Sequence, residues 1–181
     1  MVDEIKSNIN KSQEFLKKKD FNNAELILLK NLELSDESFE TFFLLGTIAG
    51  IKKNLNKAET YLKKAKNLNS NNKNLFLNLA IIQKKMNKKN ESIDNFKKVI
   101  ALDKDNLESL CGLAQIFEEE GNFKTAETFF KKVLEIDSNH HIANHSYGKL
   151  LLKLNQHIKG LKLIEKVSGI IRFKKDILKI I

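Results

Sequence analysis

Residues 107–140 read LESLCGLAQIFEEEGNFKTAETFFKKVLEIDSNH, and the fold class follows from the pattern of apolar residues in them. Its first half has one apolar helix face, with side chains at the i, i+3, i+4 and i+7 positions. These residues are Leu110, Leu113, Ala114 and Phe117. The pattern breaks at EEEGNFKT, where Gly121 can adopt the positive φ that ends many helices. A second apolar stripe follows, formed by Ala126, Phe129, Phe130, Val133 and Leu134. The stretch therefore predicts two helices joined by a short turn.

The same pattern recurs every 34 residues along the chain. One series of small residues consists of Ser12, Gly46, Ala80, Ala114 and Gly148, and a second consists of Ala24, Ala58, Ser92, Ala126 and Gly160. Four residues after the second series stand large apolar ones: Leu28, Leu62, Phe96, Phe130 and Ile164. Two helices approach closely only where neither carries a bulky side chain, so the series predict five pairs of closely packed helices. The polar turns SDES, NSNN, DKDN and DSNH separate the units and offer Asp, Asn or Ser to cap the next helix.

These residues resemble the tetratricopeptide repeat (TPR) family, whose pattern places bulky, Leu, Gly/Ala and Tyr positions on the first helix and Ala, Phe and Ala on the second. The resemblance covers nearly the whole chain. It implies an all-α fold: a TPR-type α-solenoid, a right-handed superhelix of antiparallel helix pairs. Residues 1–174 would hold five TPR-like units, at about 5–38, 39–72, 73–106, 107–140 and 141–174. The family's usual proline at the end of the second helix is absent, and Asp36, Ser70, Lys104, Ser138 and Arg172 stand there instead.

The two ends of the chain depart from the repeat. In the first unit Asn8, Ser12 and Asn31 occupy positions that are apolar or small elsewhere, as expected of an N-terminal cap with one face lacking a neighbour. Residues 175–181 leave two alternatives open: the start of a capping helix on the fifth unit, or a link to a further domain. Self-association through this apolar C-terminal segment is a further expectation.

Composition narrows the class of protein. The chain has 181 residues, no proline, one cysteine and a formal net charge of +9. A single cysteine excludes an intramolecular disulfide. No apolar run is long enough to span a membrane, and MVDEIKSNIN does not resemble a signal peptide, so we expect a cytoplasmic protein. The fourth unit is acidic between basic neighbours and only one basic residue is arginine, which argues against a nucleic-acid partner.

The sequence contains no catalytic motif that we recognise, and we expect neither an enzyme nor a cofactor. Cys111 has no histidine at a family-specific spacing and is expected to be a buried, inert thiol. His141 and His145 are four residues apart, a workable spacing for metal ligands on one helix face. No acid or cysteine in the same segment completes the set, so we expect no metal site there.

The resemblance also implies that the first helix of each unit lines a concave groove. Ile51 and Lys85 are among the inward positions, and the candidates for contacting a peptide are Phe43, Leu44, Thr47, Asn74, Leu77, Asn78, Ile81, Glu108, Cys111, Gln115, Glu119, His145 and Lys149. Some TPR proteins grip a peptide carboxylate with five set residues, of which only Asn78 has a match here. In the alternative interpretation Phe43 and Leu77 pack between neighbouring units instead of contacting a ligand.

These observations favour a non-catalytic protein–protein interaction scaffold that binds a peptide or partner protein in the concave TPR groove. The acidic fourth unit would suit a peptide with apolar anchors and a basic portion. The alternative is the N-terminal TPR region of a larger enzyme, a transferase or oxygenase, whose catalytic domain lies outside this chain.

Overall fold

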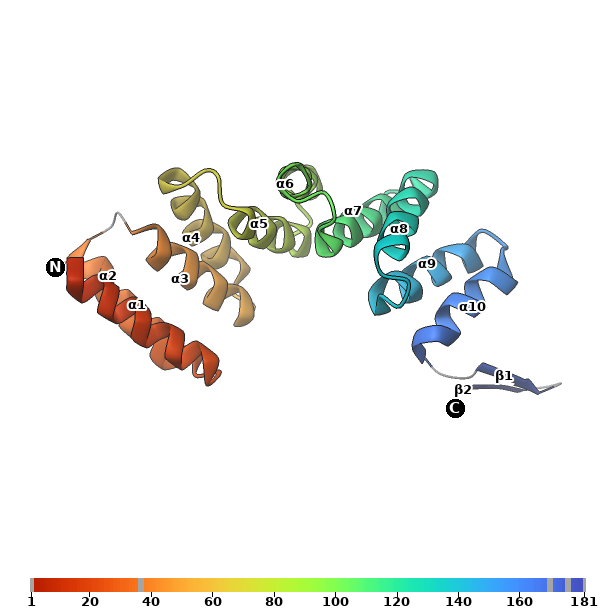
Figure 1. The fold of residues 1–181 in the computed structure, drawn as a ribbon, viewed down its shortest axis with the longest axis horizontal. Coiled ribbons are helices and arrows are strands. Elements are labelled where there is room, and N and C mark those ends of the chain that lie inside the picture. The colour runs from red at the N-terminus through yellow and green to blue at the C-terminus, as the bar shows by residue number, and fades with distance from the viewer. Residues whose placement is uncertain (1, 36–37, 169–170, 175–176, 181) are drawn as a thin grey trace. The chain divides into compact units, whose positions relative to one another are not determined.

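The computed structural model describes residues 2–35, 38–168, 171–174 and 177–180. These residues form ten α-helices and two short strands (Figure 1). The helices are α1 (Val2–Lys17), α2 (Phe21–Leu34), α3 (Phe39–Ile51), α4 (Leu55–Leu68), α5 (Lys73–Lys85), α6 (Lys89–Leu102), α7 (Leu107–Glu119), α8 (Phe123–Ile136), α9 (His141–Lys153) and α10 (His157–Ser168). The chain divides into two compact units, Met1–Asn95 and Phe96–Ile181.

The turn inside each helix pair repeats with the sequence. One residue at every turn has a positive φ, between 58° and 76°: Lys19, Lys53, Asn87, Gly121 and Asn155. These positions are 34 residues apart. Only one of them, Gly121, is a glycine, the residue type from which the sequence predicts such a turn. Asparagine also tolerates this left-handed conformation, whereas lysine adopts it at a cost.

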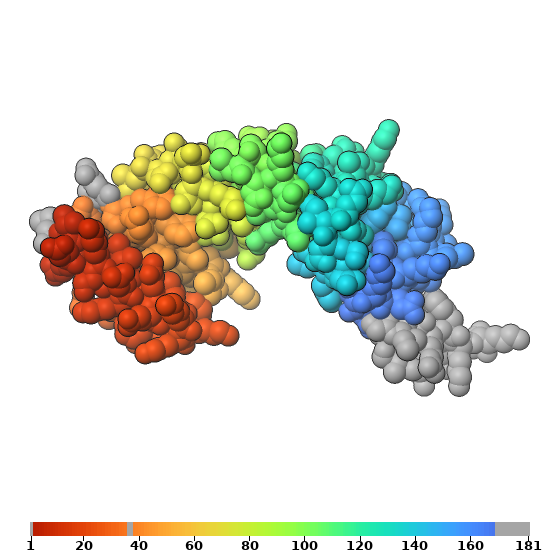
Figure 2. Space-filling view, viewed as in Figure 1, coloured from red at the N-terminus to blue at the C-terminus, as the bar shows by residue number. Residues whose placement is uncertain are grey.

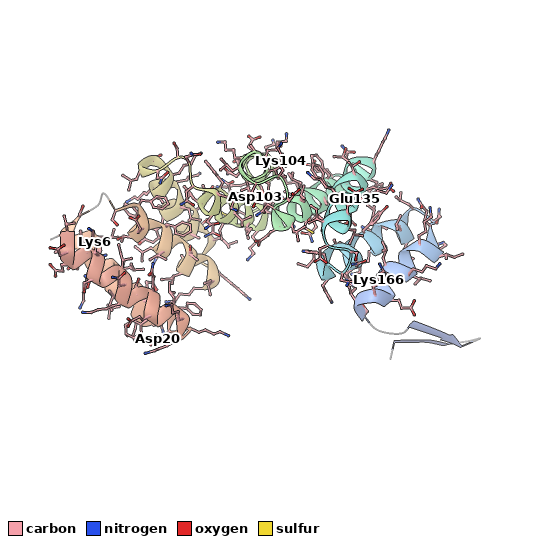
Figure 3. All side chains as sticks on the ribbon, in the orientation of Figure 1. Lys6, Asp20, Asp103, Lys104, Glu135 and Lys166 are labelled. Carbon is pink, nitrogen blue, oxygen red and sulfur yellow. The ribbon has the colours of Figure 1, made fainter. Side chains whose placement is uncertain are left out.

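The polar turns between units cap the first helix of the next pair, as the sequence predicts. The side-chain oxygens of Ser38, Asn72 and Asn106 each accept a hydrogen bond from the backbone N–H three residues later, at 3.2, 3.0 and 3.0 Å. The fourth turn differs, because His140 caps α9 through its ring: Nδ1 accepts from the N–H of Ala143 at 3.2 Å. Figure 3 shows Asp20 at the turn between α1 and α2, where it caps α2.

The predicted small residues bring the paired helices together in the N-terminal unit. A Cβ added to Gly46 on α3 would lie 2.6 Å from Cγ of Leu62 on α4, closer than real Cβ atoms approach. Ala24 and Ala58 are fully buried at the matching positions of α2 and α4. In the space-filling view, side chains close the gaps that the ribbon leaves between these helices (Figure 2). The close approach predicted from the 34-residue series is therefore confirmed.

The polar residues of the first unit are not the solvent-facing cap that the sequence suggests. Ser12 and Asn31 are both 0% exposed. The Asn31 Oδ1 atom accepts from Nδ2 of Asn8 at 2.8 Å, and Asn31 Nδ2 donates to the Ile5 carbonyl at 3.2 Å and to Oγ1 of Thr41 at 3.3 Å. The interpretation as an exposed face is wrong for these two residues, since hydrogen bonds satisfy Asn31 inside the junction of α1, α2 and α3.

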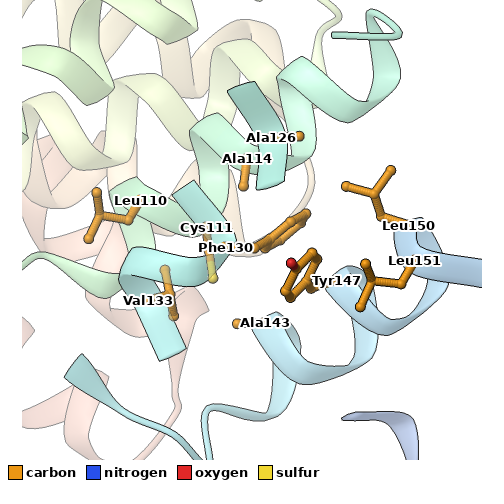
Figure 4. Close-up of a cluster of buried hydrophobic side chains, with 10 residues drawn as sticks. All are labelled: Leu110, Cys111, Ala114, Ala126, Phe130, Val133, Ala143, Tyr147, Leu150 and Leu151. Carbon is orange, nitrogen blue, oxygen red and sulfur yellow. The ribbon is translucent and has the colours of Figure 1, made fainter. Parts of the chain in front are cut away.

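The core of the C-terminal unit gathers side chains from α7, α8 and α9 (Figure 4). Tyr147 stacks on Phe130 with ring centroids 5.8 Å apart, and its hydroxyl donates to Oε1 of Glu127 at 2.8 Å. Burial and the nearby Glu127 carboxylate raise the pKa of Tyr147. Hydrogen bonds from Lys131 and Tyr147 lower the pKa of Glu127. The pair therefore fixes α9 on α8 through one charged hydrogen bond.

The C-terminal segment corrects a prediction. The structure has strands β1 (Ile171–Lys174) and β2 (Ile177–Ile180), paired antiparallel with Ile171 opposite Ile180 and Lys174 opposite Ile177. Ile177–Ile180 is thus not the start of a capping helix. The alternation in IRFK and the β-branched isoleucines favour strands. Residues 175, 176 and 181 lie outside the described part. A link to a further domain and self-association through this segment stay predictions.

Candidate functional site

Helices α3 and α5 contain all of the candidate binding residues of the N-terminal unit. They contact each other directly, and α4 holds both in place. Leu62 of α4 packs against the Gly46 backbone of α3 and shares a buried cluster with Leu75 and Leu79 of α5. Because the cluster fixes both helices, side chains on their other face have defined positions.

A cleft of about 170 Å³ opens between these helices. Its lining consists of Gly46, Thr47, Gly50, Ile51, Leu62, Asn78, Ile81, Ile82 and Lys85. Three of the candidate peptide-contacting residues, Thr47, Asn78 and Ile81, come together in it. Ile51 and Lys85, expected at inward positions, line it as well. The cleft is a largely apolar recess bordered by an amide, a hydroxyl and an ammonium group.

The polar groups of the cleft retain hydrogen-bonding capacity. Asn78 Nδ2 donates to Oγ1 of Thr47 at 3.0 Å, and that hydroxyl donates to the Phe43 carbonyl at 2.8 Å. An Asn side chain offers two donor hydrogens and an acceptor oxygen, so one bond to Thr47 leaves Asn78 able to pair with an extended backbone. The bond to Thr47 also holds the Asn78 amide in one orientation.

Other candidate residues on α3 and α5 lie outside the cleft lining. Phe43 is half-buried, stacks on Phe39 with centroids 5.7 Å apart, and packs against the cluster around Leu62. Leu44 is half-buried against the cluster of Ala24, Leu28, Leu45 and Ile48. For Phe43 the structure therefore agrees with the packing alternative. Leu77 is half-buried and Asn74 is exposed, and neither contributes to the cleft.

The candidates in the C-terminal unit have mixed environments. Glu108 and Glu119 on α7 and Lys149 on α9 are exposed, whereas Gln115 and His145 are half-buried. Cys111 is 4% exposed and belongs to the core cluster, so it presents almost no surface to a ligand. As contacts for a peptide, these residues stay predictions.

Cys111 lies near a histidine that the sequence spacing did not indicate. Its Sγ is 3.8 Å from Nδ1 of His140. That nitrogen already accepts the N–H of Ala143, so in neutral His140 the ring proton is on Nε2. The contact therefore places Cys111 beside a helix cap.

The structure adds two findings on metals and membranes. Among the described residues, no three His, Cys, Asp or Glu side chains are grouped so that they could hold a metal ion. None of the helices in the described part is both long and apolar enough to cross a lipid bilayer.

A network of ion pairs and hydrogen bonds around the buried Glu59 carboxylate joins α4, α5 and α6 within the N-terminal unit. The Glu59 carboxylate is bound by Lys88 at 2.5 Å and Lys63 at 3.0 Å, and it accepts from Nε2 of Gln83 at 3.3 Å. The Gln83 Oε1 atom accepts in turn from Nδ2 of Asn95 at 2.7 Å. Burial opposes ionisation of Glu59, but these hydrogen bonds together lower its pKa to about 2. Glu59 is therefore a fully engaged anion near neutral pH.

Sequence reasoning missed how glycine shapes the cleft. Gly46 belongs to the small-residue series, but Gly50 lies one turn later and its significance was not recognised. A Cβ on Gly50 would lie 2.9 Å from Cδ1 of Ile82, so a larger residue would push against the cleft wall. The sequence signal for the cleft is the pair Gly46 and Gly50, four residues apart on a helix that also contains groove candidates.

The helix pairs, the recurring turn and the cleft between consecutive first helices define a repeat protein of the TPR α-solenoid class. The tetratricopeptide repeat family model matches residues 39–72, 74–106 and 107–140, more than half of the chain. The chain therefore belongs to the TPR family, as the sequence predicts. A comparison with curated proteins found no match.

Solved structures of TPR-type proteins resemble this chain over most of its length. A crystal structure of MamA has 21% identity and a TM-score of 0.77, covering 86% of this chain and 91% of MamA. A MamA fragment from Desulfovibrio magneticus RS-1 has 15% identity and a TM-score of 0.83, covering 91% and 93%. YrrB, described as a TPR protein with an unusual peptide-binding site, has 20% identity and a TM-score of 0.75, covering 88% and 82%. At these identities the similarity shows the fold alone.

Proposed function

We propose that this protein is a non-catalytic protein–protein interaction scaffold that binds an extended polypeptide segment across α3 and α5. An apolar side chain of the partner enters the cleft, and the Asn78 amide pairs with the partner's backbone. The observation that carries the proposal is the convergence of Thr47, Asn78 and Ile81 on one cleft. All three are groove candidates from the sequence, and together they supply apolar surface and directed hydrogen bonding.

Two further points support this function. The cleft lies on helices whose opposite sides are fixed by buried residues, so the scaffold loses little conformational entropy when it binds. YrrB, which has the same fold, is described as having a peptide-binding site. A pocket combining apolar walls with a few placed polar groups is the common form of a recognition site.

The proposal can be tested with a display library of random dodecapeptides selected on the full chain. Selected peptides are then measured by fluorescence anisotropy against wild type and Thr47→Leu. The larger Leu side chain fills the cleft and removes the oxygen that orients Asn78, so we expect affinity to fall at least about tenfold.

Thr60→Leu is a matched control, because Thr60 is exposed on α4 and its hydroxyl donates to the Asn56 carbonyl, as that of Thr47 does to Phe43. It should bind the peptides as wild type does. The proposed site is wrong if no peptide is enriched, or if Thr47→Leu binds the selected peptides as tightly as the control.

A further inference from the structure

We propose that the segment bound in this cleft is acidic: Asp and Glu side chains flanking its apolar anchor pair with lysines at the ends of α3 and α5. This inference rests on the proposed function and adds the chemistry of the partner. The sequence alone suggested a basic partner, because the fourth repeat is acidic. That repeat belongs to the C-terminal unit, and the charges around the cleft have the opposite sign.

The stretch of sequence from the end of α3 to the start of α6 is almost devoid of acidic residues. From Ile51 to Asn90 the sequence has eleven lysines and a single acid, Glu59. Glu59 is 7% exposed and engaged by Lys63 and Lys88, so it does not neutralise the other lysines. This part of the N-terminal unit therefore presents an excess of positive charge that its own residues do not balance.

The lysines stand where the cleft ends. Lys85 is part of its lining. A second hollow, more open to solvent, is lined by Lys52, Lys53, Asn54, Leu55, Asn56 and Met86. Consecutive residues line the two hollows, since Ile51 is followed by Lys52 and Lys85 by Met86. The lysines of the second hollow therefore lie within a few residues of the cleft lining, within reach of side chains that flank an anchor bound in the cleft.

The ion pairs distinguish the lysines that can receive a ligand. Lys52 is bound to Oε2 of Glu25 at 2.5 Å. Lys53 and Lys85 are exposed, and neither forms an ion pair with any residue that the structure describes. Two unpaired ammonium groups beside a recess complement a segment with carboxylates near its apolar anchor.

The lining of the cleft favours a polypeptide over a nucleic acid. Single strands are bound by aromatic stacking platforms, and neither hollow has an aromatic residue or an arginine in its lining. Leu62, Ile81 and Ile82 instead form walls suited to an aliphatic side chain. Asn78 can pair with a peptide backbone, as amides commonly do in grooves that bind extended segments.

The test compares peptide pools selected from the same random dodecapeptide library by wild type and by the double variant Lys53→Glu/Lys85→Glu, both as full chains. Wild type should enrich peptides with an aliphatic residue flanked by Asp or Glu. The double variant should lose the acidic preference, and wild-type-selected peptides should bind it at least about tenfold more weakly. Lys11→Glu/Lys30→Glu makes the same charge change on α1 and α2 and should behave as wild type.

Each outcome has a separate meaning. An enriched pool with neutral or basic flanks that still depends on Thr47 would overturn the acidic partner and leave the proposed function standing. Failure to enrich any peptide would overturn both. An oligo-dT 12-mer serves as the nucleic-acid probe. If it binds wild type more tightly than the selected peptides and loses binding in the double variant, the surface binds nucleic acid and the peptide inference is wrong.

Discussion

Replacing Glu59 with Gln should reveal how much the ion pairs of this buried carboxylate stabilise the fold. Gln is the closest neutral analogue of a protonated glutamate and keeps its shape. The pKa of Glu59 is lowered from 4.5 to about 2. At about 1.36 kcal/mol per pKa unit, that difference corresponds to roughly 3 kcal/mol. The Glu59 side chain is only 9% exposed, but the side chains of Lys88 and Lys63 are 35% and 56% exposed, so solvent partly screens the interaction. We therefore expect Glu59→Gln to lower the free energy of unfolding by at most about 3 kcal/mol at pH 7.

The pH dependence follows from the direction of the shift. The folded-state pKa lies below the unfolded value, so the stabilisation is complete above about pH 4.5 and is lost as pH falls toward 2. By about pH 3 roughly 2 of the 3 kcal/mol should be gone. The difference between wild type and Glu59→Gln should therefore shrink to about 1 kcal/mol there. Urea unfolding followed by far-ultraviolet circular dichroism at both pH values measures it.

Glu33→Gln provides the control, because Glu33 is exposed on α2 and has no ion pair with any described residue. It should change stability by less than about 0.5 kcal/mol at either pH. A gap between wild type and Glu59→Gln that stays constant from pH 7 to about pH 3 would refute the reasoning. So would a gap at pH 7 no larger than that of the control.

Three further substitutions test the packing, each by urea unfolding. Asn31→Ala should cost about 2 kcal/mol, because it removes the buried partner of Asn8 and Thr41; a change below about 0.5 kcal/mol would contradict the buried network. Lys19→Asn should stabilise by about 0.5 kcal/mol, since asparagine tolerates the φ of 58° at this turn; a loss of stability would contradict this. Gly112→Ala should cost at least about 2 kcal/mol, because its Cβ would lie 2.3 Å from Cζ of Phe96; wild-type stability would contradict that contact.

The sequence predicts the helix pairs because their close contacts depend on side-chain size, which a single sequence displays directly. Gly46, Ala58 and Ala80 are small for one physical reason, and each is buried where the repeat places it. The left-handed turns were harder to predict. Lys19 and Lys53 adopt a conformation that lysine disfavours, because the helices on both sides require it. Tertiary packing overrides local preference there, and only the 34-residue spacing from Gly121 could have indicated it.

The candidate site was predictable in part. The resemblance to the TPR family implies which positions of α3 and α5 face the groove, so Thr47, Asn78 and Ile81 could be chosen from the sequence. Periodicity does not tell how far a side chain turns toward its neighbour. Phe43 could therefore be named only as a candidate for ligand contact or for packing, and in the structure it is half-buried and stacks on Phe39. The sequence shows the lysines near the cleft, but it does not show whether Glu59 neutralises them. That depends on the burial of Glu59, which only the fold determines.

The buried polar groups also bear on how repeats of similar structure find the correct neighbour. Asn31 of α2 bonds to Thr41 of α3. One repeat later, the positions equivalent to Asn31 and Thr41 are Ala65 and Leu75, which are fully buried and apolar. If the first repeat packed against the third instead of the second, Asn31 would face Leu75 and lose this bond. An unsatisfied buried amide costs about 1–3 kcal/mol. Ala65 and Leu75, by contrast, could each pack against many other apolar side chains without such a cost. The Asn31–Thr41 bond therefore penalises that mispairing, which apolar packing alone would discriminate against weakly.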